Sequence, residues 1–516
     1  MHRNHSEQEA LGARLLQACS KPKECFCRNH SSLPRPRQRS YPGRLCDEQT
    51  TITTDPILRP PHSREGWRGE ILATLALAWP LALANLAQML VHAIDVIFVA
   101  RLGDAELAAA SLGISLFAVI LGPLTGMAGM TAALIAAELG RKKHAVREVR
   151  RSARMGLWLA IGLGLLALLP LQFTEELMIA TGQDPHVAEL ADRFLAILMF
   201  ATLPMLVANV LRNFVSSLGR PIFATMITVM AVGVGALANY AFVFGHFGFP
   251  ALGLEGSALA SVTVSCFSVL AYVVAIHSDR RLRRYRVFGN WWRPEWTRLR
   301  ELVLKGTPVT LTILAEMGLF SSAAFLMGRI GAIELAGHAL ALQLAALAFQ
   351  VPWGVSQAAT IRVGYFYGAR DPAGVGRAGW CALMIGSGFM VLTASLMLFV
   401  PTAILRLYVD PDLPRNAAMV GFAVQFMAVA AAFQLFDGVQ AVAAGALRGL
   451  QDTRVPMWLA LFGYWVPGLG TAVWLGFYTP LAGVGIWIGL AVGLVVVACL
   501  LTWRWAARDR IGLAPA

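Results

Sequence analysis

The 516-residue sequence contains few charged residues. Asp, Glu, Lys and Arg together make up 14% of the chain, whereas 57% of it is hydrophobic. Because soluble globular domains contain about 25% charged residues, this composition excludes a soluble globular protein. The charges that are present carry a formal net charge of +13, and such an excess occurs both in nucleic-acid-binding proteins and in membrane proteins.

Motifs for nucleotide binding are missing from the chain. There is no Walker A motif, and no G-x-G-x-x-G opens a helix after a predicted strand. The short alternating runs of a membrane β-barrel are missing as well. These absences exclude ATP bound at a standard motif as an energy source, and they leave helices as the expected elements.

The first 66 residues differ in composition from the rest. They are rich in Arg, Pro, Ser and His and have no apolar core segment, which excludes a secretory signal peptide. They hold four of the seven cysteines, Cys19, Cys25, Cys27 and Cys46. The spacing of these cysteines matches no standard zinc site. We expect residues 1–66 to be a cytoplasmic extension that is disordered, or that results from a start codon assigned too far upstream.

Long apolar segments dominate the remaining chain. Twelve of them reach the length of about 20 residues that a helix needs to cross a bilayer. They cover 71–100, 107–139, 153–172, 190–217, 221–245, 255–276, 300–328, 334–366, 376–402, 418–447, 455–478 and 483–506. Because a polar backbone in lipid must bond internally, each segment is expected to be a helix. The predicted fold class is an all-α integral membrane protein with twelve transmembrane helices.

Lys and Arg cluster in the connections that follow even-numbered spans. The densest clusters lie within 141–154 and 280–300, and Arg504, Arg508 and Arg510 close the chain. Connections after odd-numbered spans carry few basic residues and more acids. By the positive-inside rule, both termini are expected in the cytoplasm. The basic excess is therefore a topology signal, and no nucleic-acid partner is expected.

The second half of the chain repeats the first at an offset of 228 residues. The matched positions include Pro80 with Pro308, Gly126 with Gly354, and Gly140 with Gly368. The repeat predicts two pseudo-symmetric six-helix lobes, an N-lobe at 67–276 and a C-lobe at 300–506. A basic cytoplasmic loop at 277–299 joins the lobes, and a cytoplasmic tail follows at 507–516. Such duplication is typical of carriers in which one lobe rocks against the other.

Three carboxylates, Asp95, Glu316 and Asp437, interrupt the apolar spans. A charge at the bilayer centre costs about 2.5–3.5 kcal/mol or more, so it usually faces a water-filled cavity that serves ion or substrate movement. Such a carboxylate can take up a proton near neutral pH, or hold Na⁺ or a cationic substrate when ionised. The alternative is a structural acid that a neighbouring side chain satisfies.

Polar residues accompany these acids at helical spacing. Asn85, Gln88 and His92 precede Asp95 on one helix face, which indicates a wet cavity or an interhelical hydrogen-bond seam. Gln88 falls on Glu316 under the repeat. Gln434, Asp437 and Gln440 share one face of the tenth span, with Phe433 and Phe436 beside them. Aromatic faces beside an acid suit flat organic cations.

Four segments of the chain resemble the multidrug and toxic compound extrusion (MATE) family. They are 85–103 (NLAQMLVHAIDVIFVARLG), 209–221 (NVLRNFVSSLGRP), 357–371 (QAATIRVGYFYGARD) and 437–456 (DGVQAVAAGALRGLQDTRVP). The resemblance covers about 70–506. It implies a V-shaped pair of lobes that opens alternately to either side of the cell inner membrane and exports organic cations in exchange for H⁺ or Na⁺. It implies no cofactor and no enzymatic activity.

The resemblance also assigns residues to the transport site. Asp95 matches the acid of the N-lobe cavity, and Asn239 matches an amide of the same lobe. Glu316 and Asp437 match the C-lobe acids, where Na⁺ is possible. Phe433 stands where many relatives have Tyr, which leaves both H⁺ and Na⁺ open as the coupling ion. Together with Gln88, Gln434 and Phe433, these residues are the candidate coupling and substrate-binding set.

Two other functions are alternatives to an antiporter. A lipid-linked saccharide flippase of related fold needs a basic cavity for pyrophosphate, and Arg362 is the only clear basic candidate. A membrane-embedded enzyme would show paired acids or His/Glu motifs at a recognisable spacing, whereas His92 and His338 are isolated. The expected partners are cationic amphiphilic small molecules and the lipid bilayer, and the protein is expected to be a monomer.

Overall fold

The computed structural model describes residues 66–513, apart from 142–144, 181, 290–291, 407–408, 411–412 and 414–415. The expected N-terminal extension, except for its last residue, lies outside the described residues, and so do its four cysteines. The last three residues of the expected C-terminal tail lie outside them too.

Among the described residues, twelve helical segments are long and apolar enough to cross a membrane, as the sequence predicts. Ten are single helices: α2 (Gly66–Val99), α3 (Asp104–Arg141), α4 (Ala145–Leu171), α8 (Pro221–Phe244), α9 (Leu254–Ser278), α11 (Trp296–Ile330), α12 (Ala332–Ala369), α13 (Pro372–Phe399), α15 (Ala417–Gly449) and α18 (Ala482–Ala506). The described residues contain no strand. The predicted all-α fold class is confirmed.

The other two spans are composite. The fourth consists of α6 (Pro185–Leu198), the 3₁₀ turn η1 (Met199–Ala201) and α7 (Thr202–Ser217). The eleventh consists of α16 (Arg454–Gly463), the π turn η3 (Tyr464–Gly468) and α17 (Leu469–Phe477). Three short helices that the sequence analysis did not predict lie in connections, namely α5 (Thr174–Ala180), α10 (Arg280–Arg283) and α14 (Pro401–Leu405).

Several helices extend beyond the predicted apolar segments. The helix α4 begins at Ala145 rather than at 153, and its first turns contain Glu148 and Arg151, which form an ion pair at 2.9 Å. Hydropathy detects only the part of a helix that lipid surrounds. Polar turns stabilised by pairs at i and i+3 continue the helix outside that part.

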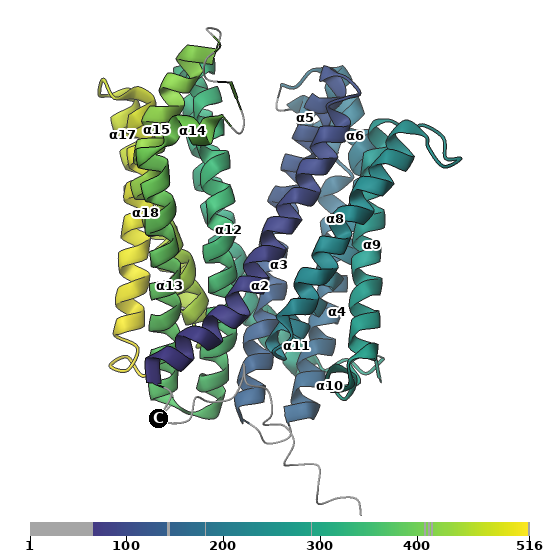
Figure 1. Cartoon of the computed structure of the whole chain (residues 1–516), viewed down its shortest axis with the longest axis vertical. Coiled ribbons are helices and arrows are strands. Elements are labelled where there is room, and N and C mark those ends of the chain that lie inside the picture. The colour runs from purple at the N-terminus through teal and green to yellow at the C-terminus, as the bar shows by residue number, and fades with distance from the viewer. Residues whose placement is uncertain are drawn as a thin grey trace, which may run out of the picture. The chain divides into compact units, whose positions relative to one another are not determined.

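The described helices form two groups, α2–α9 and α11–α18 (Figure 1). The groups diverge toward the end that carries α5 and α14. They converge toward the opposite end, which carries α10 and the last described residues. These are called the α5 end and the α10 end below.

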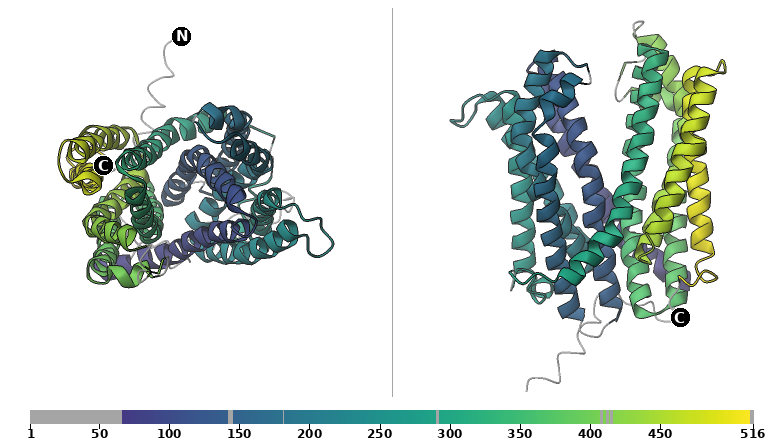
Figure 2. Two further views of the ribbon diagram at one scale, coloured as in Figure 1. Left: turned by 90° about the horizontal axis from the view of Figure 1, so that it is seen from above. Right: turned by 180° about the vertical axis from the view of Figure 1, so that it is seen from behind.

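The first helix of each group reaches into the other group. The helix α2 packs against α8 of its own group and also against α12 and α13. In the same way α11, the oblique teal helix in the right-hand view of Figure 2, packs against α3 and α4 as well as α16 and α18. Pro80 lies inside α2 and Pro308 lies inside α11, and an interior proline removes a backbone hydrogen bond and bends a helix. The two prolines are the matched positions of the repeat.

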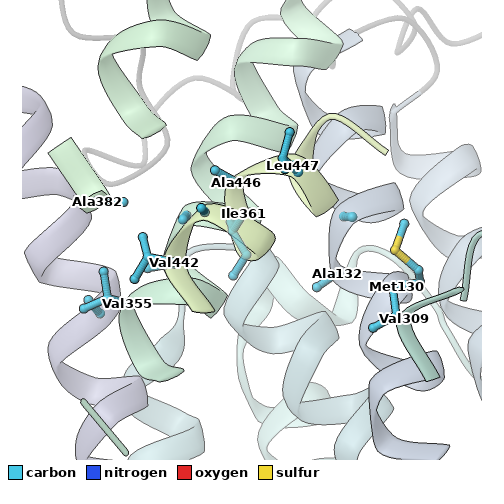
Figure 3. Packing of buried hydrophobic residues seen from close by; sticks show 14 of the residues in the cluster. Met130, Ala132, Val309, Val355, Ile361, Ala382, Val442, Ala446 and Leu447 are labelled. Carbon is cyan, nitrogen blue, oxygen red and sulfur yellow. The ribbon is translucent and has the colours of Figure 1, made fainter. Parts of the chain in front are cut away.

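Small residues allow the two groups to touch closely near the α10 end. A side chain added at Gly140 of α3 would collide with the Tyr365 carbonyl, and one added at Gly368 of α12 would collide with the Ala137 carbonyl. Gly140 and Gly368 are also matched positions of the repeat. Figure 3 shows buried side chains of the surrounding core, with Met130 of α3 beside Val309 of α11.

Two ion pairs also join the groups toward this end. Arg362 of α12 donates from Nε to Glu70 Oε1 at 2.8 Å and from Nη2 to Glu70 Oε2 at 2.5 Å, and both side chains are 0% exposed. Arg298 of α11 donates from Nη2 to Glu138 Oε1 of α3 at 2.6 Å. A bidentate guanidinium–carboxylate pair has a strict geometry. The two pairs therefore tie the first turns of α2 and α11 to the group that each helix reaches into.

Candidate ion-coupling and substrate-binding sites

The first candidate site lies inside the N-terminal group. Asp95 of α2 accepts a hydrogen bond from Asn239 Nδ2 of α8 at 2.7 Å and one from Ser261 Oγ of α9 at 3.0 Å. Asp95 is 6% exposed and Asn239 is 0% exposed. Three helices thus meet at one carboxylate, and each of its oxygens has a donor. The structure brings together Asp95 and Asn239, which the sequence analysis singled out separately, and it adds Ser261.

The polar stripe on α2 is the helix face that carries Asn85, Gln88, His92 and Asp95. Its first three residues do not bond to Asp95 and have different neighbours. Asn85 is buried; its Oδ1 accepts from Arg212 Nη2 at 2.5 Å and its Nδ2 donates to the Gln350 carbonyl at 3.4 Å. Gln88 is half-buried and His92 is exposed. The stripe therefore combines a hydrogen-bond seam at Asn85 with an acid-centred site at Asp95. Both interpretations of the stripe apply, to different residues.

The second candidate site lies inside the C-terminal group and contains two acids. Gln440 Nε2 of α15 donates to Glu316 Oε1 of α11 at 2.9 Å and to Asp437 Oδ1 of α15 at 3.3 Å. Tyr464 of η3 donates its hydroxyl to Gln440 Oε1. One amide thus bridges both carboxylates and is oriented by a phenol from a third segment.

The two other candidates on α15 do not bond to these acids. Gln434 is 0% exposed, and its Nε2 donates to Thr393 Oγ1 of α13 at 2.6 Å. Phe433 is 1% exposed and packs edge-on against Phe320 and Trp487, with ring centroids 6.0 and 5.5 Å apart. Both side chains lie in the packed core beside the site.

Tyr464 was not among the site residues predicted from the sequence. The hydroxyl that Phe433 lacks is supplied near the acids by Tyr464, from another helix and through Gln440. A signal was available, because Pro467 interrupts the apolar eleventh span. Single π turns inside helices occur frequently at functional sites.

Each group also carries a half-buried arginine beside one of its polar side chains. Arg212 of α7 bonds to Asn85, and Arg448 of α15 lies over the Trp353 ring with Cζ 5.7 Å from the centroid. Arg448 and Glu316 line the same small cavity of about 50 Å³, together with Gln440 and Tyr464. About 10–15 Å³ of such space is enough to admit one water molecule. The cavity can therefore hold a water or a small cation beside Glu316.

The C-terminal site offers oxygen ligands of the kind that hard cations prefer. Among the described residues, no group of three or more His, Cys, Asp or Glu could hold a metal ion. A cation at this site would thus be held by the two carboxylates with neutral oxygens, or a proton would take its place. Asp437 is buried, at 6% exposure, and Glu316 is half-buried.

The chain matches known proteins along most of its length. The MatE family profile matches residues 80–241 and 308–474, and the two matches begin 228 residues apart, as the repeat does. A probable multidrug resistance protein NorM of Mesorhizobium japonicum is 46% identical over 445 residues, covering 86% of this chain and 95% of that protein. A probable NorM of Brucella suis is 43% identical over 441 residues, covering 85% and 93%.

Solved structures share the fold at low sequence identity. The eukaryotic MATE transporter AtDTX14 superposes with a TM-score of 0.79 at 20% identity, covering 87% of this chain and 98% of that one. An outward-facing MATE family transporter of the MOP superfamily superposes with a TM-score of 0.77 at 21% identity, covering 92% and 100%. With its family profile, its relatives and its twelve membrane-length helices, this chain belongs to the MATE family of transporters, beside the bacterial NorM proteins.

Proposed function

We propose that this protein is a secondary antiporter that exports organic cations and other toxic compounds from a bacterium by alternating access, in exchange for H⁺ or Na⁺. The names of its relatives, multidrug resistance proteins at 37–46% identity, support the substrate class. The positive-inside rule supports placing the α10 end and both termini in the cytoplasm. The closed α10 end then makes this arrangement of helices the outward-open one.

The observation that carries the proposal is the amide bridge between Glu316 and Asp437. One Gln440 nitrogen serves an oxygen of each carboxylate. Within the described residues, the second oxygen of each acid has no hydrogen-bond donor. Two carboxylates held this closely repel each other unless a proton or a cation lies between them. The site is thus built to take up positive charge.

Ion movement and drug export are coupled if the ion and the drug cation bind to the same carboxylates. An ion can drive export only as far as its affinity differs between the two arrangements of the lobes, and a drug is displaced only if its binding is linked to that of the ion. We propose Glu316 and Asp437 as the coupling acids. Loading them with H⁺ or Na⁺ from outside would favour the return of the empty carrier to the inward-open arrangement.

We propose a second role for Asp95 in the N-terminal group. Its oxygens hold Asn239 of α8 and Ser261 of α9 against α2. Protonation of Asp95 would remove an acceptor from that contact. The helix α2 also packs on α12 of the other group. A shift of α2 at Asp95 would therefore change the packing of both groups, and we propose that this shift drives gating or drug release.

A flippase for lipid-linked saccharides fits the charges less well. Arg362, its basic candidate, lies in a bidentate ion pair with Glu70 at 0% exposure. A guanidinium in such a pair offers no free charge to a pyrophosphate.

Transport by the purified protein in proteoliposomes tests the proposal. A fluorescent organic cation is trapped inside, and a pH gradient or a Na⁺ gradient is imposed separately. We expect transport well above protein-free vesicles under one of the two gradients. Equal transport with and without each gradient would overturn the antiporter, whereas a response to only one of them identifies the coupling ion.

A further inference from the structure

A second pocket lies at the α10 end, and neither Glu316 nor Asp437 lines it. It has a volume of about 490 Å³ and lies between the first turns of α11 and the connection from α15 to α16. Its charged lining residues are Arg300, Glu301 and Lys305 from α11, Asp452 from the connection, and Arg454 at the start of α16. It is distinct from the smaller cavity at Glu316, although the two share Asp452 and Thr453. It is called the α11–α16 pocket below.

The acids of this pocket are already neutralised by neighbouring cations. Glu301 accepts from Arg298 Nη1 at 2.7 Å and from Lys305 Nζ at 2.6 Å. Asp452 accepts from Arg504 Nε at 2.6 Å.

Arg300 and Arg454 lack such a partner. Both are exposed, and no acidic group pairs with either of them within the described residues. Two guanidinium groups, one from α11 and one from the start of α16, therefore line the pocket with their charge unmatched. An anion with several oxygens, such as a phosphate, suits two guanidinium groups at once.

Apolar side chains continue from the pocket along the helices. Leu304 lines it and is 46% exposed, and Val455 and Trp458 of α16 are 40% and 63% exposed. Both α11 and α16 belong to membrane-length segments. Exposed apolar side chains on such helices face lipid tails, and Trp is enriched where the tails meet the headgroups. The cationic pocket and the apolar surface are thus continuous.

We propose that the α11–α16 pocket binds the phosphate headgroup of an anionic phospholipid from the leaflet at the α10 end. The phosphate lies between Arg300 and Arg454, and the acyl chains follow Leu304, Val455 and Trp458. Basic pockets between transmembrane helices on the cytoplasmic side bind such headgroups. A soluble phosphate would use the two arginines but would gain nothing from the apolar surface.

Binding of defined lipids to the full-length protein in detergent tests this assignment. Native mass spectrometry counts bound phosphatidylglycerol, phosphatidylcholine or glycerol 3-phosphate on the wild type and on Arg300→Gln/Arg454→Gln. The matched control is Arg283→Gln/Arg293→Gln, which removes two exposed arginines of the same end outside the pocket. The protein's melting temperature with each lipid is the second readout.

We expect phosphatidylglycerol to bind the wild type and the control alike. Since each basic residue contributes about 1 kcal/mol toward an anionic lipid, and this is a factor of about five, the pocket variant should bind it about 25-fold more weakly. Phosphatidylcholine should bind weakly to all three proteins. Unchanged phosphatidylglycerol binding by the pocket variant, or an equal loss in the control, overturns the site. Glycerol 3-phosphate binding as tight as that of the lipid overturns the lipid as its occupant.

Discussion

The side-chain amide of Gln440 determines how the two acids of the C-terminal group face each other. It donates to Glu316 and to Asp437, and Tyr464 fixes its orientation by donating to its oxygen. Because a single amide nitrogen serves both carboxylates, any ion that enters must replace or share these bonds. Gln440 is therefore a positioning residue for the proposed coupling site.

Replacing Gln440 by Leu should disable gradient-driven transport. Leaving buried polar partners unpaired costs about 1–3 kcal/mol, so we expect the transport rate in proteoliposomes to fall at least about five-fold. Gln434→Leu is the matched comparison, because it removes the same group from the same helix but breaks only a bond to Thr393. A larger loss in Gln434→Leu than in Gln440→Leu would contradict this assignment.

The sequence predicted the acids better than their partners. A carboxylate within an apolar span stands out by itself, so Asp95, Glu316 and Asp437 were identifiable without a structure. Ser261 and Tyr464 were not, because hydroxyl groups are common in membrane helices and only tertiary packing brings these two to the acids. Gln434 and Phe433 share a helix region with Asp437, but their side chains bond and pack elsewhere.

At the scale of elements, α2 and α11 connect the two groups. Each begins beneath the other group and passes a proline before it reaches its own acid, Asp95 or Glu316. The repeat predicted the prolines and the pseudo-symmetric pairing of these helices. It did not predict that they cross between the groups, because periodicity along the chain carries no information about which helices pack together.

Adding a methyl group at Gly140 should weaken the closed arrangement of the α10 end. Overpacking costs about 1–3 kcal/mol, and at Gly140 the collision with the Tyr365 carbonyl exists only while the groups touch. Gly140→Ala should therefore increase the fraction of molecules with a separated α10 end about five-fold or more. Spin labels at Arg283→Cys and Arg510→Cys, in a background without native cysteines, report that separation.

The control is Gly129→Ala on the same helix, where an added Cβ meets nothing within 4 Å. We expect its distance distribution to equal that of the parent. If Gly140→Ala gives the parent distribution as well, then the close approach of α3 and α12 does not hold the α10 end together.

At the scale of the whole molecule, the ion pair between Glu70 and Arg362 links the two groups where water is excluded. Breaking a buried pair on one side strands a charge and costs about 3–5 kcal/mol, whereas an exposed pair contributes about 0–1 kcal/mol. Glu70→Gln should therefore lower the melting temperature of the purified protein strongly. Glu189→Gln, which breaks an exposed pair with Arg193, should leave it nearly unchanged.

Replacing both Glu70 and Arg362 separates the contribution of their charges to stability from the contribution of their packing. In Glu70→Met/Arg362→Leu no charge is stranded, so most of the lost stability should return. A double variant as unstable as Glu70→Gln would mean that this region depends on the shape of the two side chains rather than on their charges.

We propose that Glu316 and Asp437, the acids of the C-terminal group, couple an ion gradient to export. The most direct measurement is efflux of a fluorescent cation from proteoliposomes under imposed pH and Na⁺ gradients, comparing the wild type with Glu316→Gln and with Asp437→Asn. We predict that both variants fold and insert normally but lose gradient-driven efflux. Efflux at the wild-type rate in both variants would contradict the account.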